Sequence, residues 1–75
     1  MGKLITIDEV ARQFSLSKAT VNYYTNLGLI SYKQKNRNRR LYDQREVEER
    51  IKRIHAMLNE GYTLRLIQKQ LLMKD

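Results

Sequence analysis

Residues 6–28 contain two helix-start signals close together, and their spacing limits the fold more than any other feature. Thr6 followed by Glu9 matches a capping box, in which each side chain satisfies the free backbone N–H of the other residue. The apolar positions that follow recur at i, i+3, i+4 and i+7, as on one face of a short helix: Ile7, Val10, Ala11 and Phe14. Ser17 is a good N-cap for a second helix, and Gly28 stands where a left-handed residue ends one. Two short helices with so brief a connection predict a helix-turn-helix.

The second of these helices, over residues 18–27, is predicted to have two unlike faces. Val21 and Tyr24 are spaced to face the first helix. The opposite stripe is polar and free of acid: Lys18, Ala19, Asn22, Tyr23 and Asn26. Such a stripe suits a helix that lies in a DNA major groove, although an ordinary exposed helix face would look the same.

Residues 32–42 carry most of the chain's excess charge. They supply +5 of the formal +7, while the residues before and after them net +1 each. The cations are Lys33, Lys35, Arg37, Arg39 and Arg40. A concentrated positive field bordered by two tyrosines favours contact with a polyanion, because a merely solvating loop usually mixes both signs.

The same segment is predicted to form a β-hairpin. Residues 29–33 and 39–42 read as short strands, with residues 34–38 as their connection. Asn36 and Asn38 tolerate turn backbone angles better than most residues.

Two further helices are predicted after the hairpin. Asp43 followed by Glu46 repeats the capping-box pattern, and Gly61 ends the helix that it opens. The apolar positions of this third helix are Val47, Ile51, Ile54 and Leu58. Thr63 caps a fourth helix, whose apolar side consists of Leu64, Ile67 and Leu71.

Together these elements predict one mainly α domain over residues 1–75 with a small β-hairpin, a winged helix-turn-helix with four helices. The helix-turn-helix spans about residues 6–28, the wing about 29–42 and the helix pair about 43–73. The chain has no cysteine and one histidine, His55, so we expect no metal site, no cofactor and no enzyme activity. It has no secretory signal or membrane-length apolar run, and we expect a cytoplasmic, nucleoid-associated protein.

The order of these motifs resembles the DNA-binding domain of the MerR family of bacterial transcription regulators. The resemblance covers about residues 4–72, through ITIDEVARQFSLSKATVNYYTNLGLI (5–30), RRLY (39–42), DQREVEERIKRI (43–54) and EGYTLRLIQKQLL (60–72). The run NRRLY (38–42) is similar to the nitrogen-regulator branch of that family. The resemblance implies a DNA-binding protein that regulates transcription.

It also implies roles for particular residues. Arg40 falls on the wing arginine that follows the DNA backbone, and Tyr42 on a closing aromatic that packs rather than contacts DNA. The recognition-helix motif covers Ser17, Lys18, Thr20 and Tyr23. Tyr62, Thr63 and Arg65 fall at the start of the last helix, where backbone N–H groups can hold a phosphate. With the polar stripe and the wing cations added, the predicted DNA contacts are Ser17, Lys18, Ala19, Thr20, Asn22, Tyr23, Asn26, Lys33, Lys35, Arg37, Arg39, Arg40, Tyr62, Thr63 and Arg65.

The chain departs from the family pattern at several of these positions. The family usually has Arg at Asn22, Glu at Thr25, Pro at Tyr32 and Gly-Tyr at Asn38–Arg39. An asparagine at position 22 allows direct readout of adenine, because its amide can pair with the N6/N7 edge. Asparagine carries no charge for a phosphate, and the additional wing cations can supply that charge instead.

The pattern favours sequence-specific binding to double-stranded DNA, and it leaves alternatives open. One is a stand-alone excisionase-like or cooperative architectural DNA-binding protein; a weaker one is a module that binds RNA or an acidic protein. Family members typically continue into a dimerising helix, so the chain is either part of a longer regulator or a complete small protein. It can then associate with itself through a region absent from this chain or by adjacent binding on DNA. The apolar positions near its end are too few for a stable coiled coil: Leu66, Leu71, Leu72 and Met73.

Overall fold

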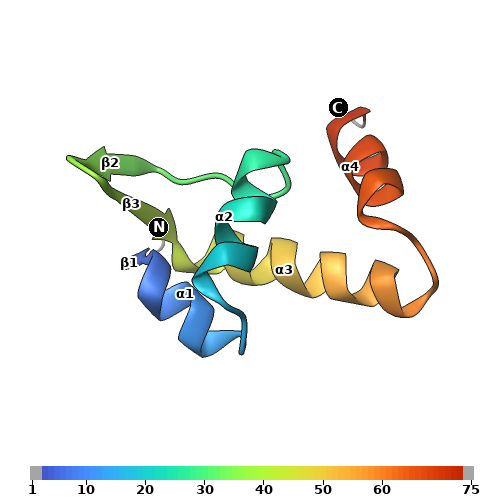
Figure 1. Ribbon diagram of the computed structural model, residues 1–75, viewed down its shortest axis with the longest axis horizontal. Coiled ribbons are helices and arrows are strands. Elements are labelled where there is room, and N and C mark those ends of the chain that lie inside the picture. The colour runs from blue at the N-terminus through green and yellow to red at the C-terminus, as the bar shows by residue number, and fades with distance from the viewer. Residues whose placement is uncertain (1–2, 74–75) are drawn as a thin grey trace.

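The computed structural model describes residues 3–73, and within them the chain forms four helices and a three-stranded sheet (Figure 1). In chain order the elements are β1 (Leu4–Thr6), α1 (Ile7–Gln13), α2 (Lys18–Asn26), β2 (Gln34–Asn36), β3 (Arg39–Asp43), α3 (Gln44–Asn59) and α4 (Leu64–Met73). The predicted class is confirmed: the fold is mainly helical with a small sheet, as in a winged helix-turn-helix.

The start signals of the first two helices form as predicted. The backbone N–H of Thr6 donates to Glu9 Oε1 at 2.9 Å, and the N–H of Glu9 donates to Thr6 Oγ1 at 3.3 Å. Ser17 caps α2 by accepting the N–H of Thr20 at 3.0 Å. Local sequence therefore determines where both helices begin.

Three helices end in the same way, with a left-handed residue just after the cap. Gly28 (φ 81°) follows α2 and Gly61 (φ 102°) follows α3, whereas Ser15 (φ 57°) takes this place after α1. After α2, the Gly28 N–H donates to the carbonyl of Thr25 at 3.0 Å and the Leu29 N–H to that of Tyr24 at 2.9 Å. This paired bonding is the Schellman motif, which satisfies carbonyls that the helix itself leaves free.

The sheet differs from the predicted hairpin in two respects. Strand β1 was not predicted; it pairs antiparallel with β3, which lies between β1 and β2. The prediction of a strand over residues 29–33 is wrong, since β2 begins at Gln34 and a two-residue turn, Arg37 and Asn38, leads to β3. Leu29 and Ile30 are both buried in the core, and consecutive residues of a strand point to opposite faces, so a two-stranded ribbon cannot bury both.

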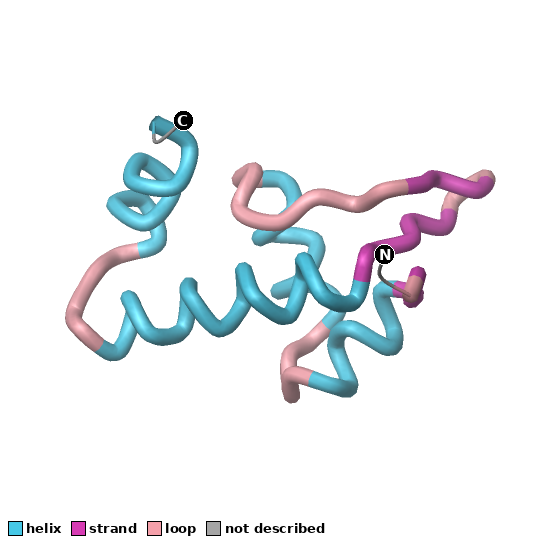
Figure 2. The backbone as a smooth tube through the Cα atoms, turned by 180° about the vertical axis from the view of Figure 1, so that it is seen from behind, coloured by secondary structure: helices cyan, strands magenta, loops and turns pink. Residues whose placement is uncertain are grey.

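The wing of the structure comprises residues 31–42. After α2 the chain runs extended to the tip of the hairpin and returns as β3, as the view from behind shows (Figure 2). β3 then leads directly into α3, whose first turn is capped by Asp43 accepting the Glu46 N–H at 3.1 Å. Only this half of the predicted capping box forms, because the Glu46 carboxylate pairs with Lys33 instead.

One apolar core joins the helices to the sheet. Its buried residues are Ile5, Val10, Ala11, Val21, Tyr24, Leu29, Ile30, Tyr42, Val47, Ile51, Ile54 and Ile67. The set includes Val21 and Tyr24 of α2 but only part of the predicted faces of α1 and α3, since Ile7, Phe14 and Leu58 are half-buried and pack against it. Among the described residues no polar or charged side chain is buried, so hydrophobic burial holds this fold together.

Helix α4 packs against the end of α2. Gln68 Nε2 donates to the carbonyl of Leu27 at 2.8 Å, and a Cβ added at Gly28 would lie 3.5 Å from Leu72 Cδ1. Leu66 and Leu72 are exposed. Leu71 is half-buried, and the side chain of Met73 lies outside the described residues.

Candidate nucleic-acid interface

The outward face of α2 is open along its length. The members of the predicted stripe are all exposed: Lys18, Ala19, Asn22, Tyr23 and Asn26. Val21 and Tyr24 are buried on the other side, and burial raises the pKa of the Tyr24 hydroxyl. The two-faced helix predicted from the sequence is confirmed.

Three polar groups at the start of α2 already have partners. The hydroxyls of Ser17 and Thr20 lie 2.9 Å apart, in addition to the capping bond from the Thr20 N–H. Lys18 Nζ lies 3.1 Å from Asp8 Oδ1 of α1, with both side chains more than half exposed. Because an exposed ion pair is weak, Lys18 can exchange this partner for another anion at little cost.

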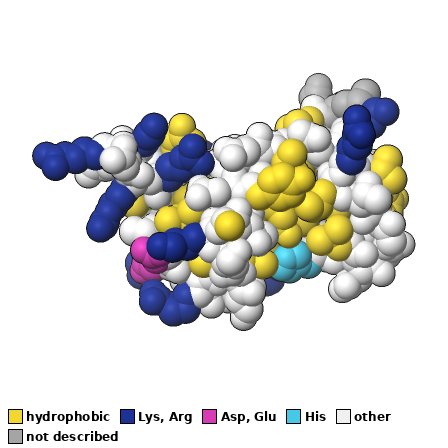
Figure 3. Space-filling view, in the orientation of Figure 1, with side chains coloured by type: hydrophobic (Ala, Val, Ile, Leu, Met, Phe, Trp, Pro, Cys, Tyr) yellow, Lys and Arg dark blue, Asp and Glu magenta, His cyan; other side chains and the backbone are white. Residues whose placement is uncertain are grey.

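The wing carries its charge on an exposed surface. All residues from 31 to 39 are exposed, and dark blue side chains project from the hairpin on the left of Figure 3. Lys33 Nζ lies 2.9 Å from Glu46 Oε2, and the hydrogen bond and charge of that carboxylate raise the pKa of Lys33. Within residues 3–73, no ion pair involves Lys35, Arg37 or Arg39. These three cations face solvent at the tip and edge of the hairpin.

A buried tyrosine attaches the wing to the helix-turn-helix. Tyr42 of β3 is fully buried, and its hydroxyl lies 3.0 Å from Thr25 Oγ1. Thr25 also donates its hydroxyl proton to the Val21 carbonyl at 2.9 Å, so Tyr42 is the donor in the bond between the two hydroxyls. The packing role expected for Tyr42 agrees with this position. The departure from the family at Thr25 was visible in the sequence, but its partner was not.

Arg40 connects the wing to the exposed face of α2. Its guanidinium lies 5.1 Å from the centre of the Tyr32 ring, and Nη1 is 3.5 Å from Asn22 Oδ1. The Tyr32 ring in turn meets Tyr42 edge-on, with centroids 6.5 Å apart. The register of β2 and β3 would place Lys33 opposite Tyr42, but the Lys33 N–H donates to the carbonyl of Leu41 at 2.7 Å, one residue out of that register. The position of the turn alone would therefore not have predicted that Tyr32 meets Tyr42.

A hollow of about 370 Å³ lies where these elements meet; we call it the α2–wing hollow. It is lined by Thr6, Ile7, Asp8, Asn22, Lys35, Asn38, Arg39 and Arg40. Sequence reasoning included four of these residues as DNA contacts and missed the start of α1, including the carboxylate of Asp8. One polar group of α2, the Asn22 amide, and three cations of the wing thus border one concave surface.

The predicted residues at the start of α4 lie outside this hollow. Tyr62 is half-buried against the core, Thr63 Oγ1 accepts the Leu66 N–H at 3.2 Å, and Arg65 is exposed. The structure confirms Thr63 as the cap of α4. It does not bring this group together with the wing.

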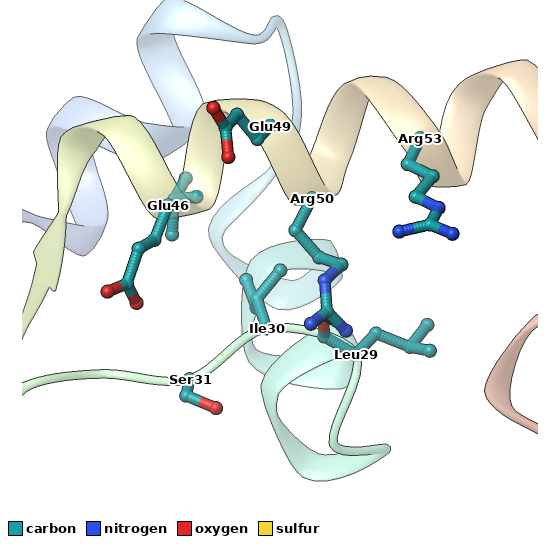
Figure 4. A pocket seen from close by; sticks show the side chains of 8 residues that line it. Leu29, Ile30, Ser31, Glu46, Glu49, Arg50 and Arg53 are labelled. Atoms are coloured by element: carbon teal, nitrogen blue, oxygen red, sulfur yellow. Dashed lines mark hydrogen bonds between the residues drawn. The ribbon is translucent and has the colours of Figure 1, made fainter. Parts of the chain in front are cut away.

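A second hollow, of about 310 Å³, lies between α3 and the segment that follows α2 (Figure 4). Its charged side chains have both signs: Glu46, Glu49, Arg50 and Arg53. Arg50 extends from α3 and donates from Nη1 to the carbonyl of Leu29 at 3.1 Å. This bond fixes the chain at the base of the wing, and the mixed charge does not suit a polyanion.

The described residues also bear on metal binding and on membrane insertion. Between residues 3 and 73, no cluster of three or more potential ligand side chains could hold a metal ion. None of the helices described there combines the length and apolar character needed to cross a bilayer.

Comparison with known proteins gives one result over nearly the whole chain. A family model described as MerR HTH family regulatory protein matches residues 5–74. No curated protein and no solved structure gives a significant match. The matched region includes both helices of the helix-turn-helix, the wing and α3.

Proposed function

The chain belongs to the MerR family of helix-turn-helix regulatory proteins, and we propose that it binds double-stranded DNA sequence-specifically to regulate transcription. One observation carries the proposal. Asn22, from the exposed polar face of α2, and the wing cations Lys35, Arg39 and Arg40 border the same hollow, so a single duplex can meet both elements. Proteins of this family are DNA-binding regulators; the sequence specificity and the individual DNA contacts are our proposal.

The wing supplies affinity in this proposal. Lys35, Arg37 and Arg39 are exposed and free of ion pairs among the described residues, so neutralising phosphates breaks no intramolecular ion pair. Phosphate contacts release counterions and make binding steeply dependent on salt. They position the protein on the duplex but carry no direct sequence information.

The recognition helix supplies the choice of sequence. Asn22, Tyr23 and Asn26 present an amide, a phenol and a second amide from the exposed face of α2. A helix fits the major groove, where each base pair shows a distinct pattern of donors and acceptors. Ser17, Thr20 and Lys18 lie at the start of this helix and are proposed to contact phosphates beside the groove.

The start of α4 is proposed as a separate backbone contact. Thr63 already satisfies one of the free N–H groups in the first turn, and exposed Arg65 adds a charge there. A phosphate at this position would accept from the remaining N–H groups and lie at the positive end of the helix dipole. Tyr62 then serves mainly to pack the turn.

The decisive experiment selects ligands from random-sequence duplexes and measures footprint and stoichiometry on the selected sites. We expect a short enriched motif and weaker competition from single-stranded RNA than from duplex DNA. Failure to enrich any motif, or preferential binding of RNA, would contradict the proposal. One protein per site, a two-fold palindrome or a growing array would distinguish a single domain, a dimer and a cooperative architectural protein.

Two lysines give a matched test of the interface. Lys18→Gln and Lys52→Gln each remove one exposed lysine from a weak ion pair, at 3.1 Å to Asp8 and 3.2 Å to Glu48. We expect only Lys18→Gln to weaken duplex binding, because Lys52 lies on α3 and outside every proposed contact. Equal losses of affinity for the two variants would mean that overall charge, rather than α2, determines binding.

A further inference from the structure

Two lysines among the predicted DNA contacts are already bound to carboxylates of the protein itself. Lys18 Nζ of α2 lies 3.1 Å from Asp8 Oδ1 of α1. Lys33 Nζ of the wing lies 2.9 Å from Glu46 Oε2 of α3. We propose that Asp8 and Glu46 are internal competitors of DNA phosphate, which a duplex displaces when it binds these two lysines. This inference rests on the proposed function and identifies two residues that limit its affinity.

The distribution of the ion pairs supports this role. Residues 3–73 contain three ion pairs, and the third joins Lys52 to Glu48, one turn apart on α3. Such a pair arises from helical periodicity alone and stabilises the helix that contains it. The other two pairs each join a predicted DNA contact to an acid on a different element. Their acids therefore meet the lysines only because of the tertiary fold.

Asp8 lies on the surface that the duplex is proposed to cover. It lines the α2–wing hollow together with Lys35, Arg39 and Arg40, and it is the one acid among the described residues that do so. A phosphate in this hollow is attracted by the cations and meets the Asp8 carboxylate beside Lys18. The carboxylate and the phosphate thus compete for one ammonium group on the same surface.

Glu46 occupies the corresponding place at the base of the wing. Lys33, its partner, is the first cation of the wing in chain order. The cations nearer the tip, Lys35, Arg37 and Arg39, have no ion pair in the described part of the chain. A phosphate can bind the tip cations directly, whereas at the base it has to replace Glu46.

The expected strength of the competition follows from the exposure of the two pairs. Side-chain exposure is 62% and 65% for Lys18 and Asp8, and 48% and 56% for Lys33 and Glu46. An ion pair this exposed changes an equilibrium constant by a factor of about 1.5 to 5. DNA can therefore displace both acids, and each acid should lower the affinity by a factor of that size.

The test measures affinity for the selected duplex after each acid is replaced by its uncharged amide. Asp8→Asn and Glu46→Gln should each raise the affinity by about 1.5- to 5-fold at low salt. Glu48→Gln is the matched control, because it removes the same charge from an ion pair of similar length, 3.2 Å, whose lysine lies outside every proposed contact. It should leave the affinity nearly unchanged.

Urea unfolding of the same variants distinguishes this role from a purely structural one. Asp8 and Glu46 both lie in the first turn of a helix, where the helix dipole favours a negative charge. If the two acids served only their helices, the variants would lose stability and gain no affinity, which would contradict the inference.

A double-mutant cycle shows whether each gain depends on the lysine. In a Lys18→Gln background, Asp8→Asn should lose most of its gain in affinity, because no ion pair is left for the duplex to break. Glu46→Gln should lose most of its gain in a Lys33→Gln background for the same reason.

The outcomes separate this inference from the proposed function. A gain from Asp8→Asn or Glu46→Gln no larger than that from Glu48→Gln would overturn the inference, as would a gain that persists in full without the lysine. Sequence-specific binding would stand in both cases. If the unmodified protein selects no duplex motif, the proposed function fails and the inference fails with it.

Discussion

The helical body and the wing are held together in different ways. In the body, α1, α2 and α3 bury their apolar faces against one another and end in specific caps. In the wing, residues 31–39 are all exposed, and the hairpin is attached through β3 and the side chains at its base. Apart from Tyr42, the region with most of the charge thus adds no buried side chain to the core, and its position depends on a few contacts.

Those contacts are concentrated near Tyr42. It is buried beneath the hairpin, bonds Thr25 of α2 and packs against Tyr32. Lys33 and Glu46 form a second link, between the wing and α3. In the proposed complex, this division would let the tip follow the phosphate backbone while its base stays fixed relative to α2.

The largest expected effect comes from removing the side chain that joins the two regions. Tyr42→Ala should lower the free energy of unfolding by about 3–5 kcal/mol, the usual cost of truncating a buried aromatic side chain. Urea unfolding would measure it, with half-exposed Tyr23→Ala as the control, expected to change stability by less than about 0.5 kcal/mol. Similar decreases for the two variants would mean that Tyr42 does not connect wing and body.

The second-largest effect is expected from neutralising the unpaired cations of the wing, which should weaken DNA binding without changing the stability of the fold. Combining Lys35→Gln, Arg37→Gln and Arg39→Gln should lower the slope of log affinity against log salt by about 2.7, or 0.9 for each phosphate no longer neutralised. The urea midpoint should stay the same, because all three side chains are exposed and unpaired among the described residues. The measurement is duplex binding at several salt concentrations.

A control for that variant removes the same charge elsewhere. It combines Lys52→Gln, Arg53→Gln and Lys69→Gln, which lie on α3 and α4. We expect its salt slope to remain close to that of the unmodified protein. Equal slopes for the two triple variants would remove the wing from the interface.

The smallest effect concerns one strained residue in each region. Ser15 and Arg37 are the non-glycine residues with positive φ within residues 3–73, at 57° and 61°. Ser15→Gly should raise the free energy of unfolding by about 0.5–1 kcal/mol. Glycine has no steric cost in this left-handed backbone conformation, and the greater conformational entropy of glycine in the unfolded state offsets only part of that gain.

Arg37→Gly should leave the urea midpoint nearly unchanged. The wing tip has no buried side chain, so it can open locally before the core unfolds. Equal stabilisation by Ser15→Gly and Arg37→Gly would show that wing and body unfold as one cooperative unit, contrary to their different modes of attachment.

Helix boundaries were predictable because their signals are local. Thr6 with Glu9, Ser17, and the glycines at 28 and 61 act on backbone groups within a few residues of themselves. The apolar spacing of α3 likewise identified Val47, Ile51 and Ile54 as buried. The stripe on α2 was predictable for the same reason, since helical periodicity alone determines which side chains share a face.

The hairpin was less predictable because its register depends on distant residues. Leu29 and Ile30 are residue types that are common in strands, yet both are buried in the core outside any strand. Strand β1 has three residues, and it forms only because β3 is present to pair with it. Four of the candidate contacts meet at one hollow, namely Asn22, Lys35, Arg39 and Arg40, whereas Tyr62, Thr63 and Arg65 lie outside it.

By itself, the sequence determined the helices, the family, the polar stripe and the location of the excess charge, because each depends on neighbouring residues. Only the tertiary structure decided that Tyr42 bonds Thr25, that Lys33 meets Glu46 and that Arg40 faces Asn22. Asn22 and Arg40 are 18 residues apart in the chain, and no local rule brings them together. Their meeting depends on the core that places β3 beside α2, and that placement brings the wing next to the amide proposed to read the DNA.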